Sequence, residues 1–313
     1  MASAEIKKII ENIEKVIVGK RGAVELVLAS LLSEGHVLIE DVPGLGKTML
    51  ARSMARSIDS TFRRIQFTPD LLPTDVTGVN IFNMKAGDFE FKPGPVFAHI
   101  VLADEINRAS PRTQSALLEC MEESNVSVDG VTYRLNRPFM VIATQNPIEL
   151  AGTYPLPEAQ LDRFLMKIAM GYPDKQEEAR ILTGQQVTHP VESISTVATV
   201  EMIRSLIQEV KRVTLSDEVK EYIVAISDAT RHHPDIALGV SPRGSLSLMK
   251  STRAFAYIGG RTFVSPDDVK VLAPYVLSHR VHLRPRLLME ERRPEQVIAE
   301  ILAQVPVPVT RGR

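Results

Sequence analysis

Short apolar runs and amphipathic segments alternate along the first 172 residues of the chain. The apolar runs are dominated by Val, Ile, Leu, Phe and Met, which is typical of strands buried on both faces of a parallel sheet. Segments with apolar residues at helical spacing separate them, beginning with residues 4–17. The alternation predicts an α/β domain over residues 1–172. The expected buried strands are residues 37–39, 62–67, 99–103, 139–144 and 165–170.

Two further segments alternate between apolar and polar residues on either side of turn residues. Residues 79–82 and 89–92 flank a turn at 86–88, and residues 126–128 and 131–135 flank Asp129-Gly130. An Asp-Gly pair between alternating runs is among the strongest hairpin signals. A hairpin is unusual inside an α/β layer. The first one is therefore interpreted either as an insertion that meets a partner or lines a pore, or as an inert surface hairpin.

Strand signals end at Tyr172-Pro173-Asp174, which marks the expected domain boundary. Residues 173–305 are predicted to form an all-α domain, and residues 306–313, rich in Pro and Val, an extended, disordered tail. The expected helices of the second domain are residues 175–183, 200–210, 217–231, 243–259 and, from Pro266, to about 278.

Composition narrows the class of protein. The chain is 44% hydrophobic and 24% charged, as is usual for soluble globular proteins. Its length of 313 residues indicates two domains. A net charge of −1 disfavours nucleic acid as a partner. The only cysteine, Cys120, excludes an internal disulfide, fits a reducing cytosol, and is expected to pack on a helix. No apolar run is long enough to span a bilayer, and the N-terminal segment carries both charge signs. A cytoplasmic protein without a signal peptide is therefore expected.

The main candidate for chemistry is the stretch 37–48, where an apolar run leads through a Pro/Gly-rich turn into a helix-forming segment. Strand, glycine loop and helix in this order are typical of a phosphate-binding loop. Gly44 and Gly46 let backbone N–H groups turn toward an anion, Lys47 would reach the β- and γ-phosphates, and the Thr48 hydroxyl would bind Mg²⁺. The usual pattern has glycine where this chain has Asp41. That departure leaves open a plain strand–turn–helix whose lysine is only a cation at the helix start.

The stretch predicts that the chain binds ATP with Mg²⁺. The break between the first two helices is expected to hold the adenine, although a plain helix–helix turn is the alternative. The predicted nucleotide-binding residues are Val18, Gly19, Asp41, Val42, Pro43, Gly44, Leu45, Gly46, Lys47, Thr48 and Met49.

Two other strand ends carry polar side chains. The run from His99 ends in Asp104-Glu105, so a buried parallel strand would deliver two carboxylates at its C-terminal end. Asp104 would hold Mg²⁺ through its water shell, and Glu105 would activate the attacking water. Asn146 ends the strand 139–144 and would orient that water beside the γ-phosphate. Alternatively, it only opens a turn before Pro147.

Two arginines are candidates for stabilising transition-state charge. Arg163 would present its guanidinium to a neighbouring subunit's nucleotide if the protein forms rings, or would form a surface ion pair with Asp162. Arg243 follows Ser241-Pro242 at a helix start, from where it would reach back to the nucleotide or form a structural salt bridge. A basic stretch later in the chain is interpreted as a mixed solvated or subunit-contact face. It comprises Arg280, Arg284, Arg286, Arg292 and Arg293.

Taken together and in this order, these motifs resemble the AAA+ ATPases, and within them the MoxR family. The resemblance covers nearly the whole chain, and Asp41 in place of the first glycine is at home in that family. The stretches that carry it are residues 39–48, 65–75, 103–108, 143–147 and 156–164.

The resemblance implies a parallel core sheet of order 5-1-4-3-2 with two inserted hairpins facing a ring pore, followed by a helical lid. It implies that Asp104 and Glu105 are the Walker B pair, Asn146 is sensor 1, Arg163 is the arginine finger and Arg243 is sensor 2. It also implies a hexameric, chaperone-like ATPase that remodels client proteins together with a von Willebrand factor A domain partner. A metal-chelatase motor subunit, a DNA-dependent motor and an ATP-gated switch are the alternatives.

Overall fold

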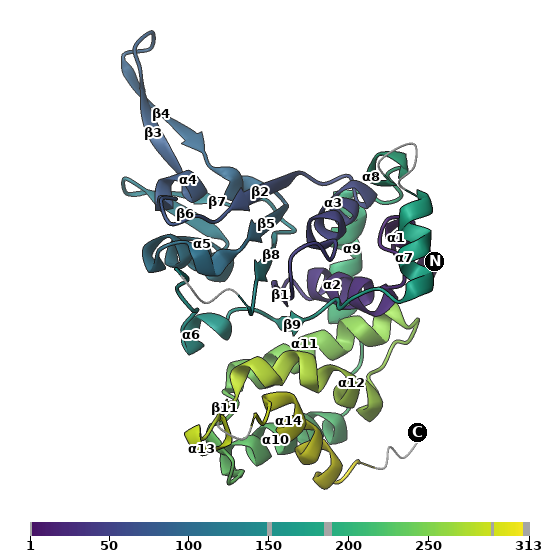
Figure 1. Cartoon of the computed structure of the whole chain (residues 1–313). Coiled ribbons are helices and arrows are strands. Elements are labelled where there is room, and N and C mark those ends of the chain that lie inside the picture. The colour runs from purple at the N-terminus through teal and green to yellow at the C-terminus, as the bar shows by residue number, and fades with distance from the viewer. Residues whose placement is uncertain (1, 149–151, 185–189, 289–290, 309–313) are drawn as a thin grey trace.

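The computed structural model describes residues 2–148, 152–184, 190–288 and 291–308. An α/β core carries a long projecting hairpin on one side, and a group of helices lies against the opposite end (Figure 1). Within the described ranges, none of the helices combines the length and the apolar character needed to cross a membrane.

The core is a five-stranded parallel sheet in the order β2-β5-β8-β1-β9. Counted along the chain, this is the order 5-1-4-3-2, so the predicted fold is confirmed. The three central strands are almost fully buried, which explains their continuous apolar sequences. The strands are β1 (Val37–Glu40), β2 (Phe62–Gln66), β5 (Ile100–Asp104), β8 (Met140–Gln145) and β9 (Met166–Ile168).

Helices cover the sheet on both sides of the strands (Figure 1). Helix α2 (Arg21–Leu32) is buried along most of its length because it is apolar nearly all round. Helix α5 (Pro111–Glu123) begins as expected, with the Ser110 hydroxyl accepting a hydrogen bond from the Thr113 N–H and Pro111 in the first turn. Cys120 on this helix is 2% exposed, so its expected packed position is confirmed. The other core helices are α1 (Ala2–Glu14), α3 (Lys47–Ser57), α4 (Pro73–Thr77) and α6 (Glu158–Leu161), with 3-10 turns η1 (Pro95–Phe97) and η2 (Ile106–Arg108).

Both predicted hairpins are present. They are formed by β3 (Gly78–Asn83) with β4 (Asp88–Pro93) and by β6 (Asn125–Val128) with β7 (Val131–Arg134). The first projects far from the core (Figure 1). The two are joined at their bases, where the rings of Phe91 and Tyr133 stack with centroids 4.0 Å apart. Toward its tip the first hairpin leaves large apolar side chains exposed, among them Phe82, Met84 and Phe89.

The second domain is helical, as predicted, but among the described residues it contains three helices beyond the five expected, over residues 190–193, 285–288 and 294–304, and one small sheet. Strands β10 (Ile236–Leu238) and β11 (His282–Leu283) pair antiparallel, which the hydrophobic pattern did not predict because such short strands have no readable period. The helices are α7 (Lys175–Gly184), α8 (Pro190–Ser193), α9 (Val200–Lys211), α10 (Asp217–His232), α11 (Pro242–Ile258), α12 (Pro266–Leu277), α13 (Pro285–Leu288) and α14 (Pro294–Gln304), with a 3-10 turn η3 (Ser278–Arg280).

One apolar cluster joins the two parts of the chain. It runs from α1, α2 and α3 into the inner faces of α9, α11 and α12, so the lid packs on the core through continuous hydrophobic contacts. The boundary expected after residue 172 falls between β9 and α7 and stays a prediction. Of the expected tail, residues 306–308 have no regular structure, and residues 309–313 lie outside the described part of the chain.

Candidate nucleotide-binding site

The phosphate loop connects β1 to α3 and depends on two glycines. Gly44 has φ +87° and Gly46 has φ +83°, a left-handed conformation that residues with a Cβ rarely adopt. Gly46 is also the cap residue of α3. A Cβ on Gly44 would meet nothing within 4 Å, so backbone conformation, and not crowding, requires glycine there. A loop with this conformation can turn its N–H groups toward an anion at the start of α3, where the helix dipole adds positive charge.

Asp41, the departure from the usual pattern, is an anchor for this loop. Its Oδ2 accepts hydrogen bonds from the backbone N–H groups of Met170 and Gly171, both at 2.8 Å, and its Oδ1 accepts one from Val42 at 3.0 Å. The Asp41 carbonyl oxygen also accepts a hydrogen bond from Lys47 Nζ at 2.5 Å. Asp41 thus ties the loop to the chain that leaves β9 toward the lid.

A pocket of about 390 Å³ lies above the C-terminal ends of the strands. Burial lowers the pKa of Lys47 from its ordinary value, and the nearby charges of Asp41, Asp104 and Glu105 oppose that shift. Lys47 is therefore partly desolvated, and a charge in such a place interacts more strongly with a phosphate than it would in water. Most of the predicted site residues meet here, with two additions from β2. The lining residues are Pro43, Gly44, Gly46, Lys47, Thr48, Met49, Arg64, Gln66, Asp104, Glu105 and Asn146.

Asp104 is fixed from two sides. Its Oδ1 accepts a hydrogen bond from Thr144 Oγ1 at 2.6 Å, and its Oδ2 accepts one from Arg64 Nη2 at 2.6 Å. Thr144 is buried in β8 and Arg64 is on β2, so both neighbouring strands orient the carboxylate. The sequence reasoning missed Arg64. The sequence feature that could have identified it is the alternation of polar and apolar residues in β2. Ile65 is buried, whereas Arg64 and Gln66 on either side of it are exposed near the end of the strand.

Glu105 occupies a left-handed conformation with φ +56°, immediately after β5. Its N–H donates to Thr144 Oγ1 at 2.8 Å. Its Oε2 accepts hydrogen bonds from Gln66 Nε2 and Arg108 Nη1, each at 3.0 Å. Thr144 therefore positions both acids of the pair, and Gln66 is a further site residue that was not predicted.

Asn146 lines the pocket, as predicted, and also opens a turn. Its Oδ1 accepts a hydrogen bond from the Ile148 N–H at 3.1 Å. With Oδ1 engaged in that turn, the Nδ2 donors are the part of the amide that can interact with a ligand in the pocket.

The oxygen ligands that Mg²⁺ prefers are also present in this pocket. The Thr48 hydroxyl and the Asp104 carboxylate line one cavity together with the glycine loop and Lys47. A triphosphate with its divalent cation therefore fits the chemistry of the residues gathered here.

The predicted adenine contacts lie next to this pocket without lining it. Ile17 Cδ1 is 4.0 Å from where a Cβ on Gly46 would be, so the turn after α1 lies beside the phosphate loop. Gly19 has φ +74° and packs tightly against the side chain of Glu177. Lys20 Nζ donates to the Tyr172 carbonyl oxygen at 2.8 Å. The turn at Val18 and Gly19 thus also contacts the start of the lid segment.

The two predicted catalytic arginines lie elsewhere. Arg163 and Arg243 line a second cavity of about 250 Å³ between the core and the lid, together with Glu122. Arg163 Nη2 is 3.1 Å from Glu122 Oε2, and Arg243 Nη2 donates to Glu122 Oε1. The hydrogen bond from Arg243 is the main cause of a lowered pKa for Glu122. In this arrangement Arg243 makes a salt bridge and does not line the phosphate-loop pocket of its own chain. Ser241, the residue that caps α11, donates a hydrogen bond to Asp162.

Two family models match the chain, one over the α/β core and one over the helical lid. Residues 36–166 match the model described as the ATPase family associated with various cellular activities (AAA), and residues 228–301 match the AAA lid domain. The first match contains the phosphate loop, both hairpins and the acid pair. Fold, site and matches together define an AAA+ ATPase.

Curated relatives narrow the class to one family. The chain is 55% identical to the Bacillus subtilis protein YeaC over 97% of its own length and 95% of that protein. It is 43% identical to Chaperone MoxR1 of Mycobacterium tuberculosis, covering 97% of this chain and 82% of the relative. It is 30% identical to Protein MoxR of Methylorubrum extorquens, with coverages of 94% and 91%. The chain belongs to the MoxR family of AAA+ ATPases.

A solved structure supports the same fold over the whole length. The crystal structure of a candidate ATPase from Cytophaga hutchinsonii is 38% identical in sequence, with a TM-score of 0.92. The alignment covers 98% of this chain and 96% of that structure, so the placement of lid against core is shared.

Proposed function

We propose that this protein hydrolyses ATP as a subunit of a hexameric ring and uses the hydrolysis to remodel client proteins. The observation that carries the proposal is the division of the machinery over two places. The phosphate loop and the acid pair share one pocket, whereas Arg163 and Arg243 lie at another cavity and face Glu122. One subunit therefore holds the nucleotide beside Lys47 and Arg64, but its own Arg163 and Arg243 lie outside the pocket in which charge develops during hydrolysis.

In the pocket, each residue of the chain has a distinct task. The loop N–H groups and Lys47 bind the phosphates. Thr48 and Asp104 would hold Mg²⁺, which when bound neutralises charge on the β- and γ-phosphate oxygens. Glu105 takes a proton from the attacking water, and Asn146 orients that water through its amide. Arg64, which bonds Asp104 Oδ2, adds a further positive charge on the same side.

The position of the arginines supports a ring. Arg163 and Arg243 share Glu122, so they belong to one surface and would enter a neighbour's pocket together. An arginine supplied from another subunit accelerates hydrolysis by about 10³–10⁵ in related systems. In this proposal Arg243 acts on a neighbour's nucleotide, whereas the sequence suggested the nucleotide of its own subunit.

The projecting hairpin supports the remodelling part of the proposal. Exposed Phe82, Met84 and Phe89 form an apolar surface at its tip, and such surfaces on soluble proteins are typical of binding sites for other proteins. A chaperone role also agrees with the name of the MoxR1 relative. A partner with a von Willebrand factor A domain and a cytoplasmic location complete the proposal by family analogy.

Mixed rings test the division of labour. Glu105→Gln subunits keep Arg163 and lack the base, whereas Arg163→Ala subunits keep the base and lack the arginine. Each variant alone should be inactive, and an equimolar mixture should regain phosphate release at interfaces that combine the intact halves. Arg180→Ala, at an exposed position of α7, is the matched control and should hydrolyse normally. Wild-type turnover by Arg163→Ala alone would refute the interface role.

A further inference from the structure

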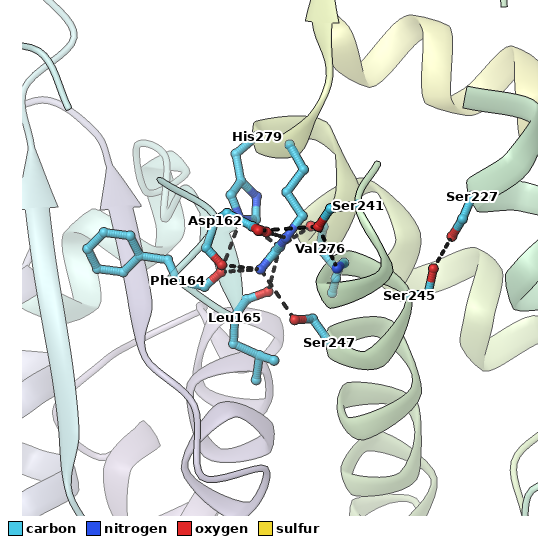
Figure 2. A network of polar contacts seen from close by, with 11 residues as sticks. Asp162, Phe164, Leu165, Ser227, Ser241, Ser245, Ser247, Val276 and His279 are labelled. Atoms are coloured by element: carbon cyan, nitrogen blue, oxygen red, sulfur yellow. Dashed lines mark hydrogen bonds and ion pairs between the residues drawn. The ribbon is translucent and has the colours of Figure 1, made fainter. Parts of the chain in front are cut away.

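Arg280, expected on a mixed solvated or subunit-contact face, is instead buried between the lid and the core. Arg280 is the last residue of η3, which follows α12, and it is 6% exposed. Its Nε donates to Asp162 Oδ1 at 2.7 Å, Nη2 to the Phe164 carbonyl oxygen at 2.6 Å and Nη1 to the Leu165 carbonyl oxygen at 3.2 Å. Figure 2 shows these three acceptors gathered on the core side of the network. A buried guanidinium with this many partners fixes the geometry of whatever it binds.

The partners of Arg280 bracket Arg163 in the sequence. Besides the Asp162 side chain, Nη2 also bonds the Asp162 carbonyl oxygen at 3.1 Å. The residue before Arg163 and the two residues after it are thus held by one lid side chain. The backbone position from which Arg163 extends is set by the lid.

The same network reaches the start of α11, where Arg243 lies. Ser241 Oγ donates to Asp162 Oδ2 at 3.3 Å. A Cβ on Gly244 would lie 3.0 Å from Arg280 Cδ, so the first turn of α11 leaves room for the Arg280 side chain. On the lid side, Nη2 of Arg280 also donates to Ser247 Oγ at 3.3 Å. Asp162 and Arg280 therefore connect the backbone of Arg163 to the helix that carries Arg243.

We propose that the Asp162–Arg280 pair is a positioning device that holds Arg163 and Arg243 as one unit attached to the lid, so that movement of the lid carries both arginines toward or away from the neighbouring subunit's nucleotide. This inference rests on the proposed function, in which those arginines act across the subunit interface. Arg280 itself is a positioning residue, since it bonds the chain around Arg163 and lines neither the phosphate-loop pocket nor, in the described residues, the second cavity.

The test uses the mixed rings. It asks whether a change at Arg280 impairs the subunit that donates the arginines or the subunit that contributes the nucleotide pocket. Glu105→Gln subunits donate the arginines to Arg163→Ala subunits, which contribute the pocket. With Arg280→Lys added to the donor, phosphate release by the mixture should fall about a hundredfold, as expected when a reacting group is misplaced by about 1 Å. With Arg280→Lys added to the acceptor, the mixture should keep its activity and its affinity for ATP. A merely structural role would impair both mixtures equally.

A second ion pair of the lid provides the matched control. Arg261 Nη1 is 2.5 Å from Asp268 Oδ2 and, among the described residues, makes no hydrogen bond to the core. Arg261→Lys in the donor should therefore leave the mixture active. If Arg280→Lys does not fold, Asp162→Asn in the donor replaces it, because that change removes the charge and keeps the carbonyl acceptors. A folded donor variant that complements as well as its parent would overturn the inference. If the mixture of Glu105→Gln and Arg163→Ala subunits is already inactive with Arg280 intact, the interface role of Arg163 is refuted instead.

Discussion

Arg163 Nη2 lies 3.1 Å from Glu122 Oε2, and both side chains keep about one third of their surface exposed, 28% and 33%. Ion pairs with this exposure contribute about 0–1 kcal/mol to stability. The pair therefore orients Arg163 without holding it strongly, and a phosphate group on a neighbouring subunit can replace the carboxylate.

Glu122→Gln tests this role. The change should lower kcat by about tenfold, because both guanidinium groups lose the anion that orients them before the neighbour's nucleotide arrives. The affinity of the subunit's own pocket for ATP should not change, since Glu122 does not line it. Steady-state phosphate release and nucleotide titration measure the two effects. Glu119→Gln, exposed on the same helix, is the control, and equal effects of both changes would contradict the prediction.

Lys47 and Glu105 should have distinguishable roles, the first in binding ATP and the second in hydrolysing it. Lys47→Ala removes the cation that meets the phosphates and should abolish ATP binding. Glu105→Gln keeps the shape of the side chain and removes the base, so it should bind ATP normally and release no phosphate above background. Fluorescent-nucleotide titration with a phosphate-release assay distinguishes them. Turnover by Glu105→Gln at the wild-type rate would show that another group activates the water.

Asp41→Ala should loosen the phosphate loop. The carboxylate accepts two charge-assisted hydrogen bonds from Met170 and Gly171, and their loss should cost about 2–3 kcal/mol of local stability. ATP affinity should fall by about tenfold or more, because the loop must then be ordered on binding. Calorimetric nucleotide titration checks this, with Asp88→Ala on the exposed hairpin as control. Unchanged affinity would mean that the loop keeps its shape without this anchor.

The protein should lose stability as the pH falls below about 6.5 because of His36. Burial lowers the pKa of His36 from 6.5 to about 4. Its Nδ1 accepts a hydrogen bond from the Val141 N–H at 2.9 Å and its Nε2 is 3.0 Å from the Met121 carbonyl oxygen, which selects the neutral tautomer with the proton on Nε2.

Between about pH 6.5 and pH 4 the unfolded chain therefore binds a proton that the folded chain does not, so the free energy of unfolding decreases as the pH falls. The total contribution is on the order of 3 kcal/mol. Urea unfolding at several pH values measures the slope. His36→Gln should reduce it, and His232→Gln, at an exposed position, should not. An identical slope in His36→Gln and wild type would refute the assignment.

Much of this protein is determined by local sequence. The buried strands, the two hairpins and five of the lid helices follow from hydrophobic period and turn residues, which act within a few positions of each other. Gly44, Gly46, Lys47 and Thr48 could be identified because a phosphate loop is a continuous segment. The acid pair could be identified because the end of a buried strand has a fixed place in a parallel sheet.

Tertiary structure decided how distant segments meet. Asp41 bonds Gly171 across 130 positions, Arg243 meets Glu122 across 121, and Arg280 bonds Asp162 across 118. No local sequence pattern predicts such pairs, because they form only when distant segments of the chain pack together. For Arg280 the sequence held one overlooked signal, its place directly after the buried last turn of α12, which contains Val276 and Leu277. A charge that follows such a buried turn can only be buried where acceptors are supplied, and the core supplies them here from the turn that carries Arg163.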